Sequence, residues 1–342
     1  MNIIITGGSR FISLTLAKYI INFTNDKILL IDNLKCTKNL NLFFKTMIDK
    51  DRISIFKTDL EDKKSIDYIF LKFHPHIIIN IEYDYNINNK ITDYSNNFIR
   101  NNFVNTLNLL ECSKNYWNSL DIVDKKTFKF NCIFKSDVYY KFNILNVLQE
   151  ISIHDNINPY LISKSLISCL MSSWYFSYKL PIIITNISNH YGPLDFSNTL
   201  ISKSIFNALL GKKIVLNKDN IFEINNWLYI DDYVRSLYNL TVKGDIGYIY
   251  NIRSYYLSNI RLLKIICYLL NILVKIKPVG VSNFFDLIVS NSFHQKSFLN
   301  NNFIYNIINT KIESKIDKNF KNKIVKTIKW YIKNIELLNS FF

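Results

Sequence analysis

Short apolar runs alternate with helical runs up to about Leu180, and this alternation constrains the fold more than any other feature of the chain. The predicted strands are almost wholly apolar, which is typical of parallel strands buried on both faces. They lie at residues 2–6, 27–32, 53–57, 76–81, 128–134 and 181–187. The predicted helices between them lie at residues 11–23, 63–73, 96–117 and 160–179. The pattern predicts an α/β fold with a doubly wound parallel sheet, in which ligands bind beyond the carboxyl ends of the strands.

A glycine turn joins the first predicted strand to the first predicted helix. It reads Thr6-Gly7-Gly8-Ser9-Arg10-Phe11-Ile12-Ser13. In a dinucleotide-binding unit one glycine makes the tight turn, a second lets the backbone approach a pyrophosphate, and a third lets helix and strand pack closely. Gly7 fills the first of these positions, whereas Arg10 and Ser13 fill the other two. Asp32 ends the second strand about 20 residues downstream, where an acid holds an adenosine ribose. The sequence therefore predicts a Rossmann sheet whose cofactor contact is obstructed at Arg10.

Beyond residue 190 the alternation loosens. Helices are predicted near residues 199–210, 231–240, 257–274 and 322–337, with short strands between them. We expect an NAD-binding Rossmann domain over residues 1–190 and a smaller mixed substrate-binding domain over residues 191–342, partly interleaved with the first. Residues 296–320 have weak periodicity and receive no assignment.

Composition argues against several partners. The formal net charge is +15, but only six of the 42 basic residues are arginine and the lysines are scattered. Phosphate-binding interfaces favour bidentate arginine, so we expect no nucleic-acid partner. The longest apolar stretch, near residues 262–273, is too short to cross a bilayer, and no membrane partner is expected. The five cysteines are widely spaced, which predicts buried thiols, a cytoplasmic location and no metal site.

Glycine is scarce in this chain. There are seven glycines, and none lies between Gly8 and Gly192. Turns and helix ends of α/β proteins commonly need residues with positive φ, a role that glycine fills best. We expect asparagine to replace glycine at some of these sites, at a cost in stability.

Tyr160 and Lys164 lie four residues apart on the helix predicted after the fifth strand, so they share one face of that helix. A lysine cation lowers the pKa of a neighbouring phenol, and the phenolate is then a usable base near neutral pH. The spacing is common by chance in a chain with 22 tyrosines. Its position downstream of a Rossmann turn favours a catalytic role.

Other short phrases follow in a fixed order from residue 1 to about residue 252. They include Thr58-Asp59-Leu60, Asp137-Val138-Tyr139, Ser188-Asn189, Tyr191-Gly192-Pro193 and Trp227-Leu228-Tyr229. With the glycine turn and the Tyr-Lys pair, these phrases resemble the extended short-chain dehydrogenases/reductases. Within that NAD-dependent epimerase/dehydratase family, the chain is most similar to the dTDP-glucose 4,6-dehydratases.

The resemblance implies a lyase that converts dTDP-glucose to dTDP-4-keto-6-deoxyglucose by internal redox with NAD. It implies that Tyr160, beside Lys164, takes the proton from the sugar 4-hydroxyl, and that Asn189 contacts the nucleotide sugar. It also implies a homodimer packed through the helices near residues 96–117 and 160–179. The implied NAD-binding residues are Gly7, Phe11, Ile12, Asp32, Asn33, Asp59, Leu60, Tyr160 and Lys164.

The chain departs from the family at the end of the fifth strand. The family's Thr-Asp-Glu corresponds to Lys135-Ser136-Asp137. Ser136 replaces the acid that protonates the departing 6-hydroxyl, and it has no proton to give at neutral pH. Asp137 replaces the glutamate that takes the C5 proton, and a carboxylate withdrawn by one bond length can cost ~10²-fold in rate. Asn225 or a neighbour replaces the arginine expected to grip a substrate phosphate.

Three interpretations stay open at this point. The chain is a dehydratase of low efficiency, or a non-catalytic relative that keeps the fold and the dimer, or an enzyme that uses only Tyr160 and Lys164 to oxidise or epimerise a nucleotide sugar at C4. The sequence does not decide whether the chain is an efficient enzyme.

Overall fold

A computed structural model of the chain describes most of its residues. The described residues are 1–34, 40, 43–44, 51–81, 103–135, 159–195, 199–212, 214–217, 220–252, 254–274, 288–290 and 318–335. The chain forms two compact units, one of residues 1–190 with 228–254 and the other of residues 191–227 with 255–342. The cofactor-binding and substrate-binding roles given to the two domains from the sequence stay predictions.

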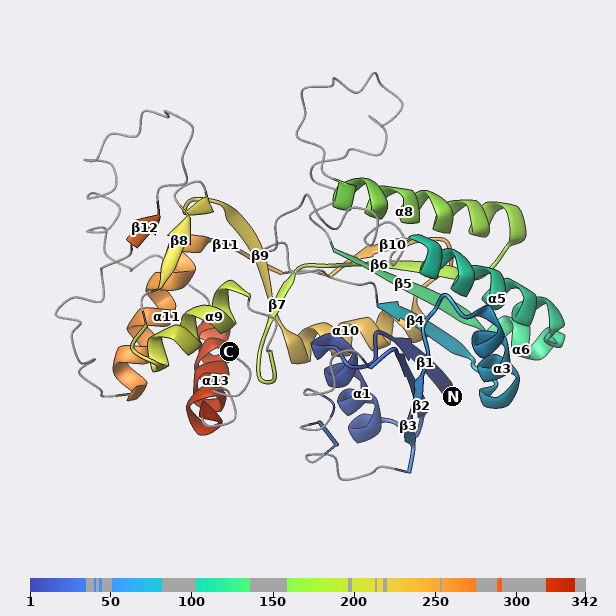
Figure 1. The fold of residues 1–342 in the computed structure, drawn as a ribbon, viewed down its shortest axis with the longest axis horizontal. Coiled ribbons are helices and arrows are strands. Elements are labelled where there is room, and N and C mark those ends of the chain that lie inside the picture. The colour runs from blue at the N-terminus through green and yellow to red at the C-terminus, as the bar shows by residue number, and fades with distance from the viewer. Residues whose placement is uncertain are drawn as a thin grey trace, which may run out of the picture. The chain divides into compact units, whose positions relative to one another are not determined.

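A seven-stranded sheet forms the centre of the first unit (Figure 1), with the strand order β10-β6-β5-β4-β1-β2-β3. Each pairing within it is parallel. The strands are β1 (Asn2–Thr6), β2 (Lys27–Asp32), β3 (Ile53–Lys57), β4 (Ile77–Ile81), β5 (Lys129–Lys135), β6 (Ile182–Ile187) and β10 (Ile249–Asn251). The chain runs outward from β1 to β3 and then places β4 on the other side of β1. The predicted doubly wound Rossmann sheet is confirmed, and its strand order reverses between β1 and β4.

Helices cover both faces of this sheet (Figure 1). They are α1 (Phe11–Phe23), α3 (Lys63–Phe73), α5 (Asn105–Ser119), α6 (Ile122–Thr127), α8 (Pro159–Tyr178) and α10 (Ile230–Lys243). Successive strand residues point to opposite faces. Cys132 joins the apolar cluster beneath α3, α5 and α8, whereas Asn131 donates a hydrogen bond to Thr241 of α10 at 2.6 Å. Because α1 packs on α10, these two helices share the second face.

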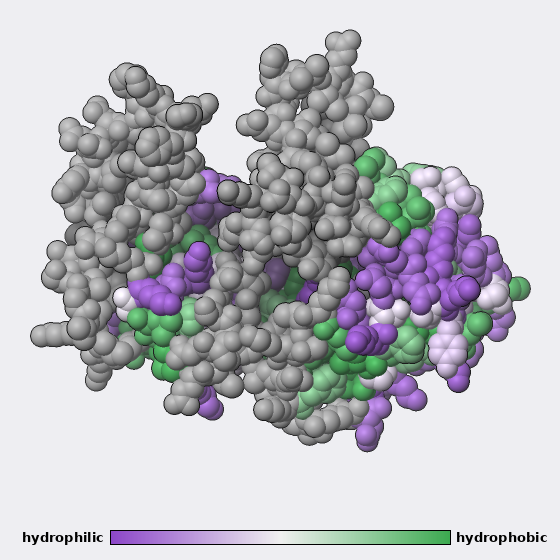
Figure 2. Space-filling model, viewed as in Figure 1, coloured by the Kyte–Doolittle hydropathy of each residue, from purple (hydrophilic) through white to green (hydrophobic). Residues whose placement is uncertain are grey.

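The first unit is apolar inside the sheet and hydrophilic on the outer side of α5 and α3, as expected for a sheet covered by helices. Ile3, Ile4 and Ile5 of the central strand are fully buried, which explains why the sequence reads as a continuous apolar run. Figure 2 shows hydrophilic residues gathered over α5 and α3, on the side of these helices that is turned away from the sheet. The short helix α6 was absent from the sequence prediction, and the described part of the helix predicted at 96–117 begins as α5 at Asn105.

The second unit is built from helices and two small sheets. Helices α9 (Leu200–Leu209), α11 (Asn259–Val274) and α13 (Lys318–Lys333) pack on one another. Strands β7 (Asn189–Tyr191), β9 (Ile224–Tyr229) and β11 (Tyr255–Ser258) form one sheet, although residues 189–190 of β7 and 228–229 of β9 belong to the first unit. Strand β8 (Val215–Asn217) pairs with β12 (Ile288–Ser290) in the other sheet. The last predicted helix begins four residues earlier than expected, and residues 296–317 lie outside the described residues. None of the described helices is both long enough and apolar enough to span a membrane.

Two sequence expectations about single residues need correction. Cys112 and Cys132 are buried, but Cys169 is exposed on α8, so the prediction of a buried thiol is wrong there. In the described part of the chain, the non-glycine residues with positive φ are Leu34, His74, Lys179 and Leu194. None of these is asparagine, because the conformation is imposed by the helix ends and turns whatever residue stands there.

The scarcity of glycine therefore leaves strain that two substitutions are expected to relieve. His74 and Lys179 follow α3 and α8 with φ of 51° and 56°, and each backbone N–H closes the last helical turn on Phe70 or Tyr175. Both side chains are exposed. An L-residue in this conformation costs roughly 1–2 kcal/mol, so the double variant His74→Gly/Lys179→Gly is expected to raise the urea midpoint measured by circular dichroism. The matched alanine pair keeps the strain, and equal midpoints for the two pairs would contradict this account.

Candidate functional site

The carboxyl ends of β1 and β4 lie side by side where the strand order reverses, the place where such sheets bind ligands. Thr6 ties these ends together. Its Oγ1 donates to Oδ1 of Asn80 at 2.8 Å and accepts from the Ile81 N–H at 3.1 Å. The turn that follows Thr6 is thereby fixed against the end of β4.

Gly7 makes the turn at this point with φ of +61°. The Arg10 N–H donates to the Gly7 carbonyl oxygen at 3.1 Å and closes the turn. A Cβ on Gly7 would lie 3.0 Å from Cδ of Arg10 and 3.1 Å from the carbonyl oxygen of Ile81. Both the conformation and the space restrict this position to glycine.

Arg10 lies across the turn. Its Cδ and Nε are the atoms nearest to the vacant side of Gly7, the same side on which the Ile81 carbonyl lies. Arg10 is also the residue that precedes α1, and its side chain does not cap the helix. The aliphatic part of Arg10 therefore covers backbone that a pyrophosphate would have to approach.

Ser13 fits its position better than the glycine pattern suggests. It is fully buried, and its Oγ donates to the Gly7 carbonyl oxygen at 2.6 Å. The hydroxyl is thus satisfied within the turn. Of the two replaced glycine positions, only Arg10 places bulk where a ligand would lie.

Asp32, at the end of β2, holds the other side of the turn. Its Oδ2 accepts from both the N–H and the Oγ–H of Ser9, at 2.9 and 2.8 Å. Its Oδ1 accepts from the Leu34 N–H at 2.7 Å. The carboxylate predicted to hold a ribose also fastens β2 to the glycine turn.

Asp59 links the ends of β2 and β3 to α5. One carboxylate oxygen accepts from Asn33 at 3.4 Å and the other from Asn105 at 3.5 Å. The carbonyl oxygen of the next residue, Leu60, accepts from Asn108 at 3.2 Å. Asn33, Asp59 and Leu60 are therefore brought together at the carboxyl edge, beside Asp32.

Phe11 and Ile12 pack inward at the start of α1 and are each 6% exposed. The Phe11 ring lies 5.4 Å from the His190 ring, which brings the start of β7 beside the start of α1. Asn189, the predicted substrate contact, is the first residue of β7 and is half-buried.

The catalytic residues predicted from the sequence fall on one helix and one segment. Tyr160 and Lys164 lie in the first turns of α8, but their side chains lie outside the described residues. Ser136 and Asp137 directly follow β5 and also lie outside them. Since β5 ends at the carboxyl edge and α8 leads back to the start of β6, the beginning of α8 lies at the same edge as the glycine turn.

Tyr229 shows that another tyrosine of the matching phrases is unsuited to act as a base. Burial, together with the Asp231 carboxylate, raises the pKa of Tyr229 above its ordinary value. The phenol stays protonated near neutral pH. Asp231 and Asp232 lie in the first turn of α10, which begins one residue before the helix start predicted at 231. Asn225 donates to Asn259 at 3.0 Å.

Ser9 and Asn105 are the site residues that sequence reasoning missed. Ser9 lies inside the glycine turn, at a position for which the dinucleotide-binding pattern specifies no residue type. The signal in the sequence was that Ser9 directly precedes Arg10. Asn105 begins α5 and carries no signal in the sequence, because its contact with Asp59 spans 46 residues.

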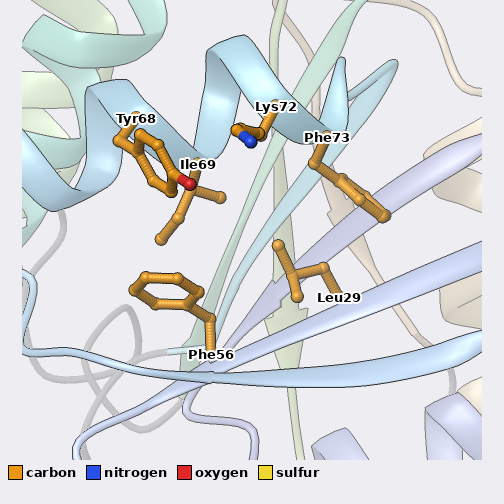
Figure 3. A pocket seen from close by; sticks show the side chains of 6 residues that line it. All are labelled: Leu29, Phe56, Tyr68, Ile69, Lys72 and Phe73. Atoms are coloured by element: carbon orange, nitrogen blue, oxygen red, sulfur yellow. The ribbon is translucent and has the colours of Figure 1, made fainter.

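A hollow of about 170 Å³ lies away from these residues, between α3 and the strands β2 and β3 (Figure 3). Figure 3 shows Phe56 and Leu29 beneath Ile69 and Phe73, with the Tyr68 hydroxyl and the Lys72 amine as the polar groups of the lining. A lining this apolar does not suit a charged nucleotide. The candidate site is therefore the carboxyl edge of the sheet.

Comparisons with known proteins show which family this chain resembles. The sequence model of a family described as GDP-mannose 4,6 dehydratase matches residues 4–268. A dTDP-glucose 4,6-dehydratase of Haemophilus influenzae is 32% identical over 340 residues, which cover 98% of this chain and 98% of the relative. One from Escherichia coli is 33% identical over 350 residues, which cover 98% and 95%.

Solved structures show the same fold. A dTDP-glucose 4,6-dehydratase of Bacillus anthracis in complex with NAD matches with a TM-score of 0.73 and 23% identity, covering 100% of both chains. One from Streptomyces venezuelae, with NAD bound, matches with a TM-score of 0.74 and 18% identity over the same coverage.

Proposed function

This chain belongs to the family of nucleotide-sugar 4,6-dehydratases, and we propose from that premise that it is an NAD-dependent dTDP-glucose 4,6-dehydratase with a slow water-elimination step. One observation carries the proposal. The glycine turn at Gly7 and the start of α8, with Tyr160 and Lys164, lie at the same edge of the seven-stranded sheet. Cofactor and substrate would meet at this edge.

Three residues at the carboxyl edge of the sheet suit NAD, and one opposes it. Gly7 and the α1 N-terminus lie where a pyrophosphate binds, and Asp32 and Asp59 lie where the adenosine portion binds. Arg10 has to leave the face of Gly7 before the pyrophosphate can approach. NAD, when bound, supplies the hydride acceptor and donor for the internal redox step.

The chain's own residues would move the protons. Tyr160 removes the proton of the sugar 4-hydroxyl, and the Lys164 cation lowers the pKa of that phenol. Asp137 removes the C5 proton. Ser136 cannot protonate the departing 6-hydroxyl, and the absence of a general acid lowers the rate by about 10²–10⁴-fold. Elimination is therefore the slow step.

A second candidate function is oxidation or epimerisation at C4, because the Ser136 position has lost the general acid while Tyr160 and Lys164 are kept. Oxidation or epimerisation at C4 needs only that pair. Such an enzyme would invert or exchange at C4 and leave the 6-hydroxyl in place. The third interpretation, a non-catalytic relative, predicts neither reaction.

The variant Tyr160→Phe tests the proposed base. It removes the hydroxyl but keeps the ring, so we expect turnover of dTDP-glucose to fall by about 10²–10⁴-fold while NAD affinity changes less than about twofold, since a lost neutral hydrogen bond is a small part of dinucleotide binding. Tyr68→Phe, on α3 and 51% exposed, is the matched control, because it removes a tyrosine hydroxyl outside the candidate site, and should leave turnover unchanged. Equal turnover for Tyr160→Phe and the wild type would remove this tyrosine from the mechanism.

We propose a homodimer packed through α5 and α8 as the working form. Leu166, Phe176 and Tyr178 are exposed apolar side chains on α8, while α5 is covered by hydrophilic residues (Figure 2). This contrast supports α8 as the apolar centre and α5 as the polar rim of the contact. A cytoplasmic location belongs to the same proposal, because none of the four described cysteines forms a disulfide.

A further inference from the structure

The Ser9–Asp32 contact bears on how this site reads an adenosine ribose. Asp32 is 9% exposed and Ser9 is 7% exposed. Ser9 donates twice to the same carboxylate oxygen, through its N–H at 2.9 Å and its Oγ–H at 2.8 Å. The backbone of the turn is also held to β2, since the Gly8 N–H donates to the Ile31 carbonyl oxygen at 3.1 Å. Ser9 therefore has little freedom to move away from Asp32.

The space around Gly8 reinforces this attachment. A Cβ on Gly8 would lie 2.7 Å from Cβ of Leu30, so the turn is pressed directly onto the end of β2. The backbone of Ser9 is held at its present distance from Asp32 by that packing. Its hydroxyl therefore lies within hydrogen-bond distance of the carboxylate.

The Ser9–Asp32 contact limits the number of further hydrogen bonds that the Asp32 carboxylate can accept. An ionised carboxylate offers about four acceptor positions, two on each oxygen. Ser9 fills two positions on Oδ2, and the Leu34 N–H fills one on Oδ1. Among the contacts of the described residues, one position on Oδ1 is left. A ribose presents two hydroxyls, and each needs an acceptor.

We propose that the Ser9 hydroxyl is a specificity-determining group that limits Asp32 to one ribose hydroxyl. The inference rests on the proposed function, since it assumes that an adenine dinucleotide binds at Asp32. Oδ2 of Asp32 accepts hydrogen bonds from Ser9, and Oδ1 keeps one acceptor position for a ribose hydroxyl. Removal of the Ser9 hydroxyl opens one Oδ2 position, because the residue 9 N–H still holds the turn in place.

The test uses binding alone, on the full chain, with AMP, 2′-deoxy-AMP and 3′-deoxy-AMP as probes in calorimetry. For the wild type we expect one deoxy analogue to bind about tenfold more weakly than AMP and the other within about twofold, since a hydrogen bond to a charged group is worth about tenfold or more. For Ser9→Ala we expect AMP to bind about tenfold more tightly and both deoxy analogues to lose affinity relative to it. Ser9→Gly removes the same hydroxyl and should behave alike, and Ser9→Thr keeps a hydroxyl and should restore the wild-type pattern.

Three results would overturn the inference. A wild type that discriminates against both deoxy analogues has two open acceptors. A Ser9→Ala variant that binds AMP more weakly shows that the hydroxyl binds the ribose itself. Failure of all four proteins to bind AMP removes the ribose from this site. None of these measurements uses dTDP-glucose, so failure of dehydration and failure of ribose recognition are distinguished. The inference needs only the part of the proposed function in which an adenine dinucleotide binds at Asp32.

Discussion

Restoring the family's two carboxyl groups, in the variant Ser136→Asp/Asp137→Glu, is expected to raise the rate of water elimination from dTDP-glucose by at least about 10⁴-fold. A general acid contributes about 10²–10⁴-fold, and a base returned to its working position contributes ~10²-fold more. The measurement is the appearance of 4-keto-6-deoxy sugar in a single turnover with excess protein and NAD.

The matched control is Ser136→Asn/Asp137→Gln, which has the same side-chain shapes and cannot exchange protons. It should eliminate water no faster than the wild type. If the carboxyl pair and the amide pair give equal rates, the slow step lies elsewhere, and the explanation from Ser136 and Asp137 is wrong.

Removing the Arg10 side chain has the second large effect. Arg10→Gly exposes the backbone of the turn that the Arg10 stem covers, so we expect NAD to bind about 10- to 100-fold more tightly, the worth of one or two hydrogen bonds to a charged group. Calorimetric titration of the full chain with NAD measures it. Arg10→Lys keeps a long cationic side chain and should gain much less.

Adding Ser13→Gly to this variant should give no further affinity. The Ser13 hydroxyl is satisfied at the Gly7 carbonyl and is fully buried, while a glycine inside a helix costs roughly 0.5–1 kcal/mol. The double variant should therefore unfold at lower urea concentration and bind NAD like Arg10→Gly. Unchanged affinity in Arg10→Gly would instead point to residues 82–85, where the chain has bulky and charged side chains in place of the family's small cofactor-lining residues. These residues lie outside the described part of the chain.

Much of the fold follows from the sequence because buried parallel strands are written as apolar runs. Strands β1 to β6 begin and end within one residue of their predicted bounds. The helix α6 escaped prediction because six residues are too few to show a helical period. The positive φ of His74 and Lys179 also escaped it, because helix ends impose that conformation on residues whose types do not announce it.

Some features of the candidate site could likewise be predicted from the sequence, and others could not. Gly7 is predictable, since its conformation excludes other residues. The contacts of Ser9 and Ser13 are not, because each hydroxyl finds a partner that only the folded turn brings near. The pattern treats Arg10 and Ser13 as equal departures from glycine. In the structure the Arg10 side chain lies over Gly7, whereas the Ser13 hydroxyl donates a hydrogen bond to the Gly7 carbonyl oxygen. The roles of Tyr160, Lys164, Asp137 and Asn189 stay predictions from the family resemblance.

The most direct test of the dehydratase proposal is proton NMR of dTDP-glucose incubated with the full chain and NAD at equal concentrations. The proposal predicts slow growth of a C6 methyl signal as dTDP-4-keto-6-deoxyglucose forms, with the signal lost in Tyr160→Phe. Inversion or exchange at C4 with the 6-hydroxyl retained would contradict dehydration and favour the C4 enzyme. Unchanged dTDP-glucose, with NAD shown to be bound, would contradict both and leave a non-catalytic member of the family.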